Sequence, residues 1–246
     1  MKQPIGLIGA MASEVELLTA RLENPQTVSC GDLIFHQGRL EKQEVAIVQC
    51  GIGKVCAAMC AQAMIDRFGV SAIVNTGVAG GLAASLAVGD LVVATGAIQH
   101  DFDLTAFGHV KGYMPSVGGD TAFPTRYPAD KQLAEQFCRA ASKVMTTGKT
   151  IRGTVVSGDI FVDDTALKRT LIQQFDAAAA EMEGAAIAQV AAANHVPFAI
   201  VRAISDLAEV GATVSFDTFE KQAAALSCRI LLTMLEEPYE RKDAPC

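Results

Sequence analysis

Residues 69–89 read GVSAIVNTGVAGGLAASLAVG and contain no charged side chain over a length that could cross a membrane. The run is, however, interrupted by five glycines and by polar residues, among them Asn75 and Thr76. A short apolar run that ends in glycines is typical of a buried strand and a loop, whereas a membrane helix is continuously apolar. The stretch therefore predicts a central strand at 71–77 followed by a glycine-rich loop.

The segments on either side of this strand alternate between strand and helix patterns. Short apolar runs predict further strands at residues 5–9, 32–40, 44–50, 89–99, 151–159 and 196–206. Helical spacing predicts helices at 13–22, 51–68, 130–145 and 219–237, with Ser13 as the N-cap of the first. Residues 100–129 lack a stable period and predict a long functional loop. The alternation predicts a single three-layer α/β domain over residues 1–246.

Composition and charge restrict the possible partners of this chain. Half of its residues are hydrophobic, 19% are charged and the net charge is −7, with a mean hydropathy of +0.29. No run of Lys and Arg exceeds two residues, so the basic footprint of a nucleic-acid-binding protein is missing. A neutral or cationic small molecule is the expected partner, and neither nucleic acid nor a membrane is expected.

The seven cysteines indicate a reducing compartment. They are scattered, their number is odd, and no CxxC pair occurs. The positions are Cys30, Cys50, Cys56, Cys60, Cys138, Cys228 and Cys246. His100, Asp101 and Asp103 resemble a metal patch but lack a further ligand cluster nearby, which favours a structural role for His100. With no signal peptide at the N-terminus, we expect a cytoplasmic protein without a metal.

Three acidic residues follow predicted strands: Glu14, Glu183 and Asp206. Each has an ordinary alternative role, as a first-turn acid, a solvated helix position and an N-cap respectively. Small ligands nevertheless bind beyond the carboxyl ends of strands in α/β folds, and glycine turns stand beside these acids. Carboxylates that converge on one cleft serve the cleavage of glycosidic bonds. Glycosyl chemistry is therefore possible, whereas the patterns of dinucleotide and P-loop sites are absent.

Eight motifs together resemble the methylthioadenosine/S-adenosylhomocysteine nucleosidases of the nucleoside phosphorylase superfamily. They occur in order along nearly the whole chain: IGLIGAMASEVELL, CGIGKVCAA, NTGVAGGL, VGDLVV, HDFDLTAFG, SGDIFV, EMEGAAIA and VRAISD. The resemblance implies a three-layer α/β/α sandwich around a central mixed sheet and a homodimer without metal or organic cofactor. It also implies hydrolysis of the N-glycosidic bond of methylthioadenosine, S-adenosylhomocysteine and deoxyadenosine-type nucleosides.

The same resemblance assigns roles to individual residues. Glu14 matches the glutamate that activates the attacking water, with Arg202 nearby, and Asp206 matches the acid that protonates adenine N7 and is oriented by Ser205. Ribose hydroxyls are expected at Glu183 and Met182. The remaining matches form the rest of the site. The purine is expected at Phe161 and Val162, and backbone contacts of Ala79 and Gly80 are expected to line the floor of the site. The sugar or its tail is expected at Met11 and Ile52, and the apolar tail pocket at Leu104, Phe107 and Phe216, with Pro115 lent by the partner subunit.

Two departures from the family pattern are visible. Val78 stands where some relatives place a serine, and Ala12 and Ser13 stand where other members are acidic. Rival functions are a phosphate-dependent purine nucleoside phosphorylase, an aminodeoxyfutalosine nucleosidase of menaquinone synthesis and a non-catalytic purine sensor. Glu14 opposes the first of these, because a carboxylate repels phosphate.

The segment EMEGAAIA at 181–188 carries two acids within an alanine-rich tract. A strand over 178–183 with a helix beginning at Gly184 explains this pattern better than one continuous helix. On a strand Glu181 and Glu183 share one face, so spacing does not separate their roles. The resemblance assigns the ribose to Glu183 and leaves Glu181 as a neighbouring contact.

Overall fold

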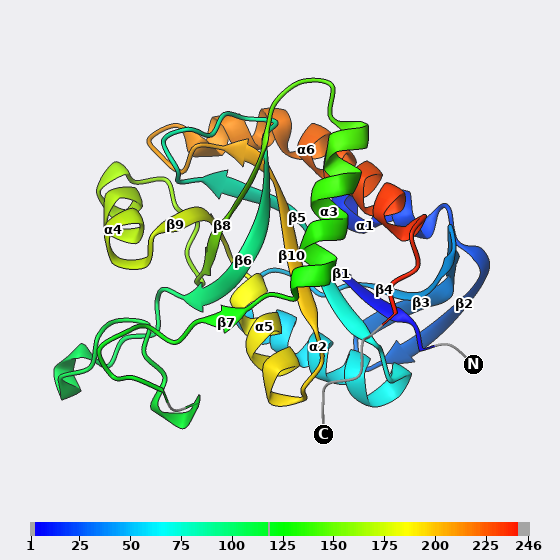
Figure 1. The fold of residues 1–246 in the computed structure, drawn as a ribbon, viewed down its shortest axis with the longest axis horizontal. Coiled ribbons are helices and arrows are strands. Elements are labelled where there is room, and N and C mark those ends of the chain that lie inside the picture. Colours follow the sequence, from blue (N-terminus) through cyan, green and yellow to red (C-terminus); the bar gives the residue numbers. More distant parts are fainter. Residues whose placement is uncertain (1–2, 118, 241–246) are drawn as a thin grey trace.

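A computed structural model describes residues 3–117 and 119–240 of the chain (Figure 1). Residues 1–2, 118 and 241–246, and with them Cys246, lie outside the described residues. The described strands are β1 Ile5–Gly9, β2 Glu23–Cys30, β3 Leu33–Leu40, β4 Gln43–Gln49, β5 Ala72–Gly81, β6 Leu91–Gln99, β7 Tyr127–Pro128, β8 Thr150–Ser157, β9 Ala177–Glu181 and β10 Phe198–Asp206. The α-helices are α1 Ala12–Thr19, α2 Lys54–Phe68, α3 Lys131–Val144, α4 Thr165–Phe175, α5 Gly184–Ala193 and α6 Ala212–Leu235.

Strand β5, which begins at Ala72, lies at the centre of one mixed sheet. β5 pairs in parallel with β1 on one side and with β10 on the other, and its end pairs antiparallel with β9. From β10 the sheet continues through β6 and β8 back to β9, so that β5, β10, β6, β8 and β9 close into a ring. β4, β3 and β2 extend the sheet beyond β1.

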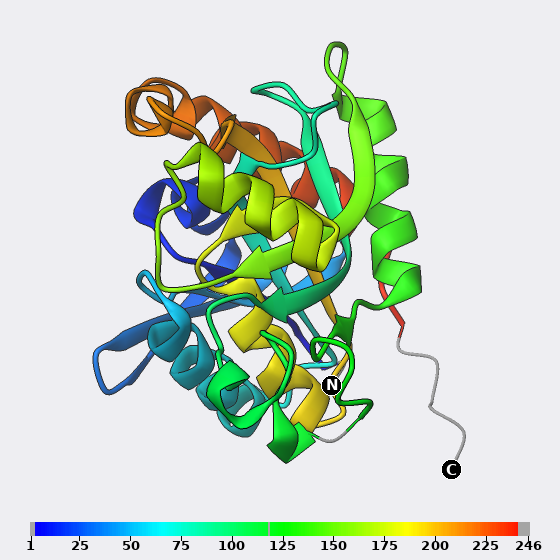
Figure 2. The same ribbon diagram turned by 90° about the vertical axis from the view of Figure 1, so that its left-hand side faces the viewer.

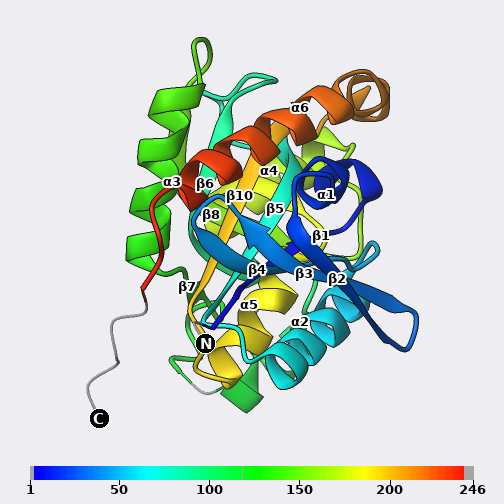
Figure 3. The same ribbon diagram turned by 90° about the vertical axis from the view of Figure 1, so that its right-hand side faces the viewer.

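Helices cover both faces of this sheet, which confirms the predicted three layers. α1, α3 and α6 pack together on one face, whereas α2 and α5 pack together on the other (Figures 1 and 3). α4 lies beside β8 and β9 (Figure 2). A separate apolar core fills each interface between sheet and helices. No helix in the described part of the chain is long and apolar enough to cross a membrane.

The ring brings several strand ends together. β9 meets β5 only where Ala179 and Ala180 pair with Gly81 and Gly80, so the carboxyl ends of these two antiparallel strands overlap. The end of β10 lies beside the same glycines, because Asp206 pairs with Gly80. The predicted convergence of strand ends therefore arises from the closure of the sheet.

Several predicted boundaries are wrong. Residues 78–81 were predicted as the start of a loop, but they are strand, because β5 continues to Gly81 and residues of β10 lie close against Gly80 and Gly81. β2 and α4 were not predicted; β2 is an exposed edge strand that contains Pro25 and therefore lacks an apolar pattern.

The ends of two helices also differ from the prediction. The N-cap of α1 is Met11, because Ser13 lies inside the helix and its hydroxyl donates to Glu220. α6 begins at Ala212, seven residues before the predicted start at Phe219. The polar first turns of α6 hide its beginning from a search for helical apolar spacing.

Candidate active site

A cavity of about 390 Å³ lies where the ends of β5, β9 and β10 meet the start of α1. Its wall is mostly apolar, with a few carboxylates set into it. Such a combination is typical of sites for small organic molecules. The lining residues are Ala10, Met11, Glu14, Ile52, Val78, Ala79, Gly80, Ile160, Phe161, Val162, Ala180, Glu181, Met182, Glu183, Ser205, Asp206, Thr213, Phe216 and Asp217.

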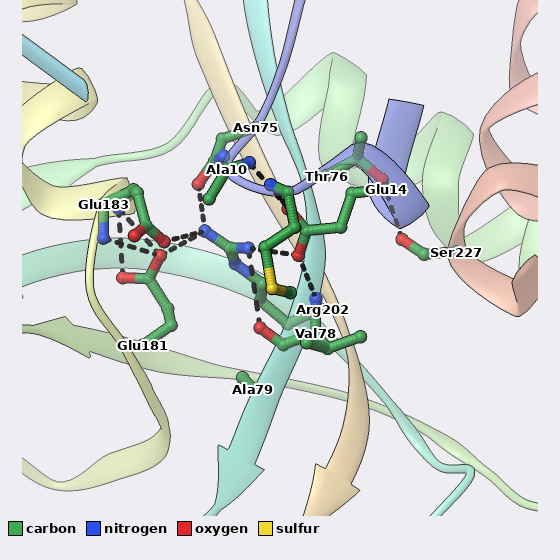
Figure 4. A network of polar contacts seen from close by, with 12 residues as sticks. Ala10, Glu14, Asn75, Thr76, Val78, Ala79, Glu181, Glu183, Arg202 and Ser227 are labelled. Carbon is green, nitrogen blue, oxygen red and sulfur yellow. Dashed lines mark hydrogen bonds and ion pairs between the residues drawn. The ribbon is translucent and has the colours of Figure 1, made fainter. Parts of the chain in front are cut away.

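The guanidinium of Arg202 lies beneath the cavity between three carboxylates (Figure 4). Its Nη1 lies 3.8 Å from Glu14 Oε1, and its Nη2 lies 3.6 Å from Glu183 Oε2 and forms an ion pair with Glu181. Nη2 also donates to the side-chain oxygen of Asn75. Arg202 is only 1% exposed. Burial disfavours its charge, but the three carboxylates outweigh burial and raise the pKa of Arg202.

The carboxylate of Glu14 folds back over the start of its own helix. Its Oε2 accepts from the backbone N–H of Ala10 at 2.6 Å and of Met11 at 3.0 Å, and its Oε1 accepts from Val78 N at 3.0 Å. Burial raises the pKa of Glu14, against the lowering effect of Arg202 and these donors. A Cβ on Gly77 would lie 2.1 Å from Glu14 Oε1, so this position requires glycine.

Glu181 and Glu183 stand at the junction between β9 and α5. The carboxylate of Glu181 accepts from the backbone N–H of Gly184 at 2.8 Å and from the hydroxyl of Ser157, so it anchors the start of the helix. Glu183 Oε1 accepts from Gly53 N at 2.9 Å. Burial, followed by the repulsion of Glu181, raises the pKa of Glu183 to about 7. The structure thus shows the predicted strand, and the helix begins at Gly184.

Asp206 is a further acidic group of the cavity. It is 2% exposed, and its oxygens accept from Ala208 N at 2.8 Å and from the Ser205 hydroxyl at 2.9 Å. Burial raises the pKa of Asp206, against these two donors. Asp206 meets β5 at Gly80 and Glu14 meets it at Val78. Two strand residues, roughly 7 Å, separate these points, so a ligand along β5 reaches both acids.

Aromatic side chains form one wall of the cavity. The rings of Phe161 and Phe216 meet edge to face, with their centroids 5.7 Å apart. Phe161 follows β8, whereas Phe216 comes from the first turns of α6. Ile160 is 47% exposed and Ile52, on the way into α2, is 57% exposed, so this wall is open at its rim.

The structure brings most of the sequence-predicted site residues to one cavity. Twelve of them line it: Met11, Glu14, Ile52, Ala79, Gly80, Phe161, Val162, Met182, Glu183, Ser205, Asp206 and Phe216. Arg202 lies directly beneath. Leu104, Phe107 and Pro115 do not line the cavity within the described chain, and Phe107 is 77% exposed. The loop over residues 100–129 therefore directs these three side chains away from the cavity of the same chain.

Some lining residues were not predicted. The sequence indicates only a neighbouring contact for Glu181, but this residue both lines the cavity and pairs with Arg202. Its position two residues before Glu183 was the available signal. Thr213 and Asp217 were missed because the start of α6 was misplaced.

His100 does not take part in a metal centre within the described chain. No group of three His, Cys, Asp or Glu side chains in residues 3–117 and 119–240 could hold a metal ion. His100 is buried, its Nε2 has no hydrogen-bond partner among the described residues, and burial lowers its pKa. Nε2 packs against Gly158, so this nitrogen does not provide the structural hydrogen bonding expected of His100.

The layered α/β fold and the small acidic cavity at its strand ends define a protein that binds a small organic molecule. The Phosphorylase superfamily matches residues 4–236. A 5'-methylthioadenosine/S-adenosylhomocysteine nucleosidase of Geobacillus thermodenitrificans is 40% identical over 93% of this chain and 94% of its own. The chain belongs to the 5'-methylthioadenosine/S-adenosylhomocysteine nucleosidase family of this superfamily.

Two solved structures support the same assignment. The nucleosidase from Neisseria meningitidis, in complex with methylthio-immucillin-A, superposes with a TM-score of 0.88 at 38% identity, covering 96% of this chain and 99% of its own. The futalosine hydrolase of Helicobacter pylori superposes with a TM-score of 0.87 at 33% identity, covering 95% and 97% respectively. The family resemblance of the sequence motifs is confirmed, as is the expectation of a nucleosidase enzyme.

Proposed function

We propose that the protein hydrolyses the N-glycosidic bond of methylthioadenosine and S-adenosylhomocysteine and releases adenine and a thio-substituted ribose. One observation carries the proposal: two buried carboxylates, Glu14 and Asp206, face one cavity that no described cationic side chain lines. The membership of the nucleosidase family supports the substrate class. Hydrolysis needs only water as co-substrate, so the cavity needs no anion site.

Asp206 acts on the leaving group. Burial raises its pKa and thereby favours the protonated form that a general acid requires. Transfer of that proton to N7 of adenine neutralises the negative charge that would otherwise build up on the departing base. Ser205, which shares a hydrogen bond of 2.9 Å with Asp206, orients the carboxyl group.

Glu14 acts on the attacking water. Three backbone N–H groups hold its carboxylate but leave part of its acceptor capacity unused, so it can also accept a proton from water. Glu183 holds the ribose hydroxyls, with Met182 beside it. The surplus of carboxylates over the single guanidinium of Arg202 stabilises the positive charge that develops on the sugar.

Apolar side chains recognise the two ends of the substrate. Phe161 stacks on the purine, which lies along the backbone of Ala79, Gly80 and Val162. Met11, Ile52 and Phe216 contact the sugar and the sulfur-bearing tail. The mostly apolar wall supports this assignment.

We also propose a homodimer in which Leu104, Phe107 and Pro115 complete the partner's tail pocket. None of the three lines the cavity of its own described chain. Exposed apolar side chains on α2, with Val55 68% and Met59 64% exposed, offer an apolar surface for a second copy. Sedimentation velocity of wild type and Val55→Asp tests this: we expect a dimer and a monomer respectively. A monomeric wild type would refute the dimer.

We also propose that residues 1–246 form a single domain and that the protein is cytoplasmic. Six unpaired cysteines in the described chain support a reducing compartment. Fractionation of cells that produce the protein tests the location, and limited proteolysis tests the domain, which should resist cleavage as one body.

A phosphorylase would need cations at the cavity. Arg202, which lies beneath the cavity, is engaged by carboxylates, and among the described lining residues none is Lys, Arg or His. Adenine release from methylthioadenosine in phosphate-free buffer, followed by chromatography, tests the proposal. We expect equal rates with and without phosphate; strict dependence on phosphate would sink the hydrolase.

The similarity to a futalosine hydrolase favours a second candidate activity. We propose that aminodeoxyfutalosine is an alternative substrate of the same cavity. A comparison of kcat/KM for aminodeoxyfutalosine, methylthioadenosine and S-adenosylhomocysteine on one enzyme sample ranks the three substrates.

A further inference from the structure

Lys54, Asp101 and Asp159 form a connected group directly behind the wall of the cavity, and we call it the Lys54 clasp. Lys54 Nζ lies 2.6 Å from Asp101 Oδ1. The other oxygen of this carboxylate, Oδ2, accepts from Asp159 N at 2.9 Å. Asp159 Oδ1 in turn accepts from the backbone N–H of Lys54 at 2.8 Å. The three residues come from the start of α2, the turn after β6 and the segment after β8.

The clasp lies between the two recognition elements of the cavity. Asp159 stands one residue before Ile160 and two before Phe161, both of which line the cavity. On the other side, Gly53 N donates to Glu183 Oε1 at 2.9 Å. Two successive backbone amides at the start of α2 therefore hold the purine segment and the ribose carboxylate.

The surroundings of the clasp make its charges effective. The side chains of Lys54 and Asp101 are only 18% and 19% exposed, so solvent screens their attraction less than it screens a surface pair. Lys54 Nζ also donates to Gln99 Oε1 at 3.2 Å, and Gln99 donates to Gln189 of α5 at 2.7 Å. Burial raises the pKa of Asp101, but the bonds from Lys54 and the backbone of Asp159 outweigh it and hold that pKa below the ordinary value.

We propose that Lys54 and Asp101 are positioning residues that fix segment 158–162 so that Phe161 and Val162 receive the purine. This inference rests on the proposed function, because it assigns the base to that segment. Neither side chain lines the cavity within the described chain, so both act through the backbone of Asp159. At its ends the segment is anchored by the bond from Gly158 N to Glu181 O and by the buried side chain of Val162, whereas Ile160 and Phe161 between them are 47% and 39% exposed.

The test uses Lys54→Met in the full-length enzyme. A looser purine segment weakens binding of the base equally in substrate and transition state, which raises KM and leaves kcat nearly unchanged. We expect a KM for methylthioadenosine about tenfold higher, an equal rise in the inhibition constant of free adenine, and a kcat within about threefold of wild type. Lys54→Arg, which keeps the charge, should recover part of the loss.

A second variant and a matched control complete the test. Asp101→Asn keeps the shape of the side chain and carries the test if Lys54→Met does not fold. The double variant Lys54→Met/Asp101→Asn should bind adenine no more weakly than whichever single variant binds it less tightly. Both substitutions break the same connection, so their effects should not add. Lys143→Met, which breaks an exposed ion pair with Glu237 just after α6, should keep wild-type KM and kcat.

The outcomes separate this inference from the proposed function. An active wild type with lowered melting temperatures but unchanged KM and adenine inhibition in both Lys54→Met and Asp101→Asn would show a merely structural clasp and overturn the inference. A fall in kcat with unchanged KM would overturn it as well. A wild type that releases no adenine from any of the three nucleosides would overturn the proposed function and the inference together.

Discussion

The floor and the rim of the cavity differ in how firmly they are held. The floor consists of Glu14, Glu183 and Asp206 over Arg202, and all four side chains are at most 4% exposed. Each of the three carboxylates accepts from a backbone N–H, and the guanidinium of Arg202 forms ion pairs with Glu14 and Glu183. The rim consists of Ile52, Phe161 and the first turns of α6, which are partly or largely exposed.

This difference separates chemistry from recognition. Groups that stabilise a transition state must be oriented before the substrate arrives, and the buried floor provides that order. Groups that grip the base and the tail must admit the substrate, and the open rim allows this. Changes in the floor should therefore act on kcat or on stability, whereas changes in the rim should act on KM.

The largest effect is expected at the acids of the floor. Asp206→Asn should lower kcat about 10²- to 10⁴-fold while KM changes little, because the proton donor to the leaving base is lost. Single-turnover adenine release measures this. Phe219→Leu, on the outer side of α6, is the control and should retain activity; a near-normal kcat in Asp206→Asn would contradict the assigned role.

Removal of the central cation should break the floor itself. Arg202→Met leaves three buried carboxylates without their guanidinium, and we expect a loss of roughly 3–5 kcal/mol in the free energy of unfolding near neutral pH. Urea denaturation measures it. Arg39→Met, which breaks the exposed pair with Glu23, should cost less than about 1 kcal/mol. Equal losses in the two variants would show that the buried pair has no special role.

A change at the rim should act on binding alone. Phe161→Ala removes the stacking surface for the purine, and such stacking contributes about 1–3 kcal/mol per base. KM for methylthioadenosine should rise roughly tenfold or more, with kcat affected less than in Asp206→Asn. Steady-state kinetics over a range of nucleoside concentrations measure both constants. A fall in kcat with unchanged KM would contradict the assignment of Phe161 to binding.

The stability of Asp206→Asn should depend on pH. A carboxyl group whose folded pKa is raised contributes stability that is complete below the unfolded pKa and is lost as pH rises through the folded pKa. Asparagine does not titrate; its Oδ1 can accept from Ala208 N, and its Nδ2 can donate to the Ser205 hydroxyl, which then accepts instead of donating. The variant should therefore melt higher than wild type at neutral and alkaline pH, by roughly 2–4 °C per kcal/mol relieved. The difference should shrink on acidification towards pH 4; a constant difference would exclude titration as its cause.

The smallest effect is expected at the contact between α1 and α6. Ser13→Glu places a carboxylate against Glu220 where a hydroxyl now donates, and so loosens the turns of α6 that carry Phe216. We expect a KM only a few-fold higher, in line with about 1 kcal/mol for one hydrogen bond. Ser13→Ala, which removes the bond without adding charge, should show about half of this free-energy change. Identical kinetics in both variants and wild type would show that Ser13 does not support the turns of α6 that carry Phe216.

Most of the floor could be predicted from the sequence, and less of the rim. The acids of the floor follow apolar strands, and strand periodicity together with the family motifs locates them. The role of Glu181 could not be separated from that of Glu183 by spacing, because only the turn into α5 directs both onto Arg202. The start of α6 was missed because polar residues in its first turns interrupt the helical apolar spacing. The direction of Leu104, Phe107 and Pro115 depends on a loop that carries no periodic signal.

The closure of the strand ring also has a consequence for synthesis of the protein. β5 pairs with β10, more than a hundred residues further along the chain, and the cavity combines Glu14 with Phe216. Such long-range pairings form slowly, because a long loop must close before they contribute. A chain still emerging from the ribosome carries Glu14 and β5 long before Asp206 exists. The enzyme should therefore gain its active site only at the end of translation, when the last quarter of the chain arrives.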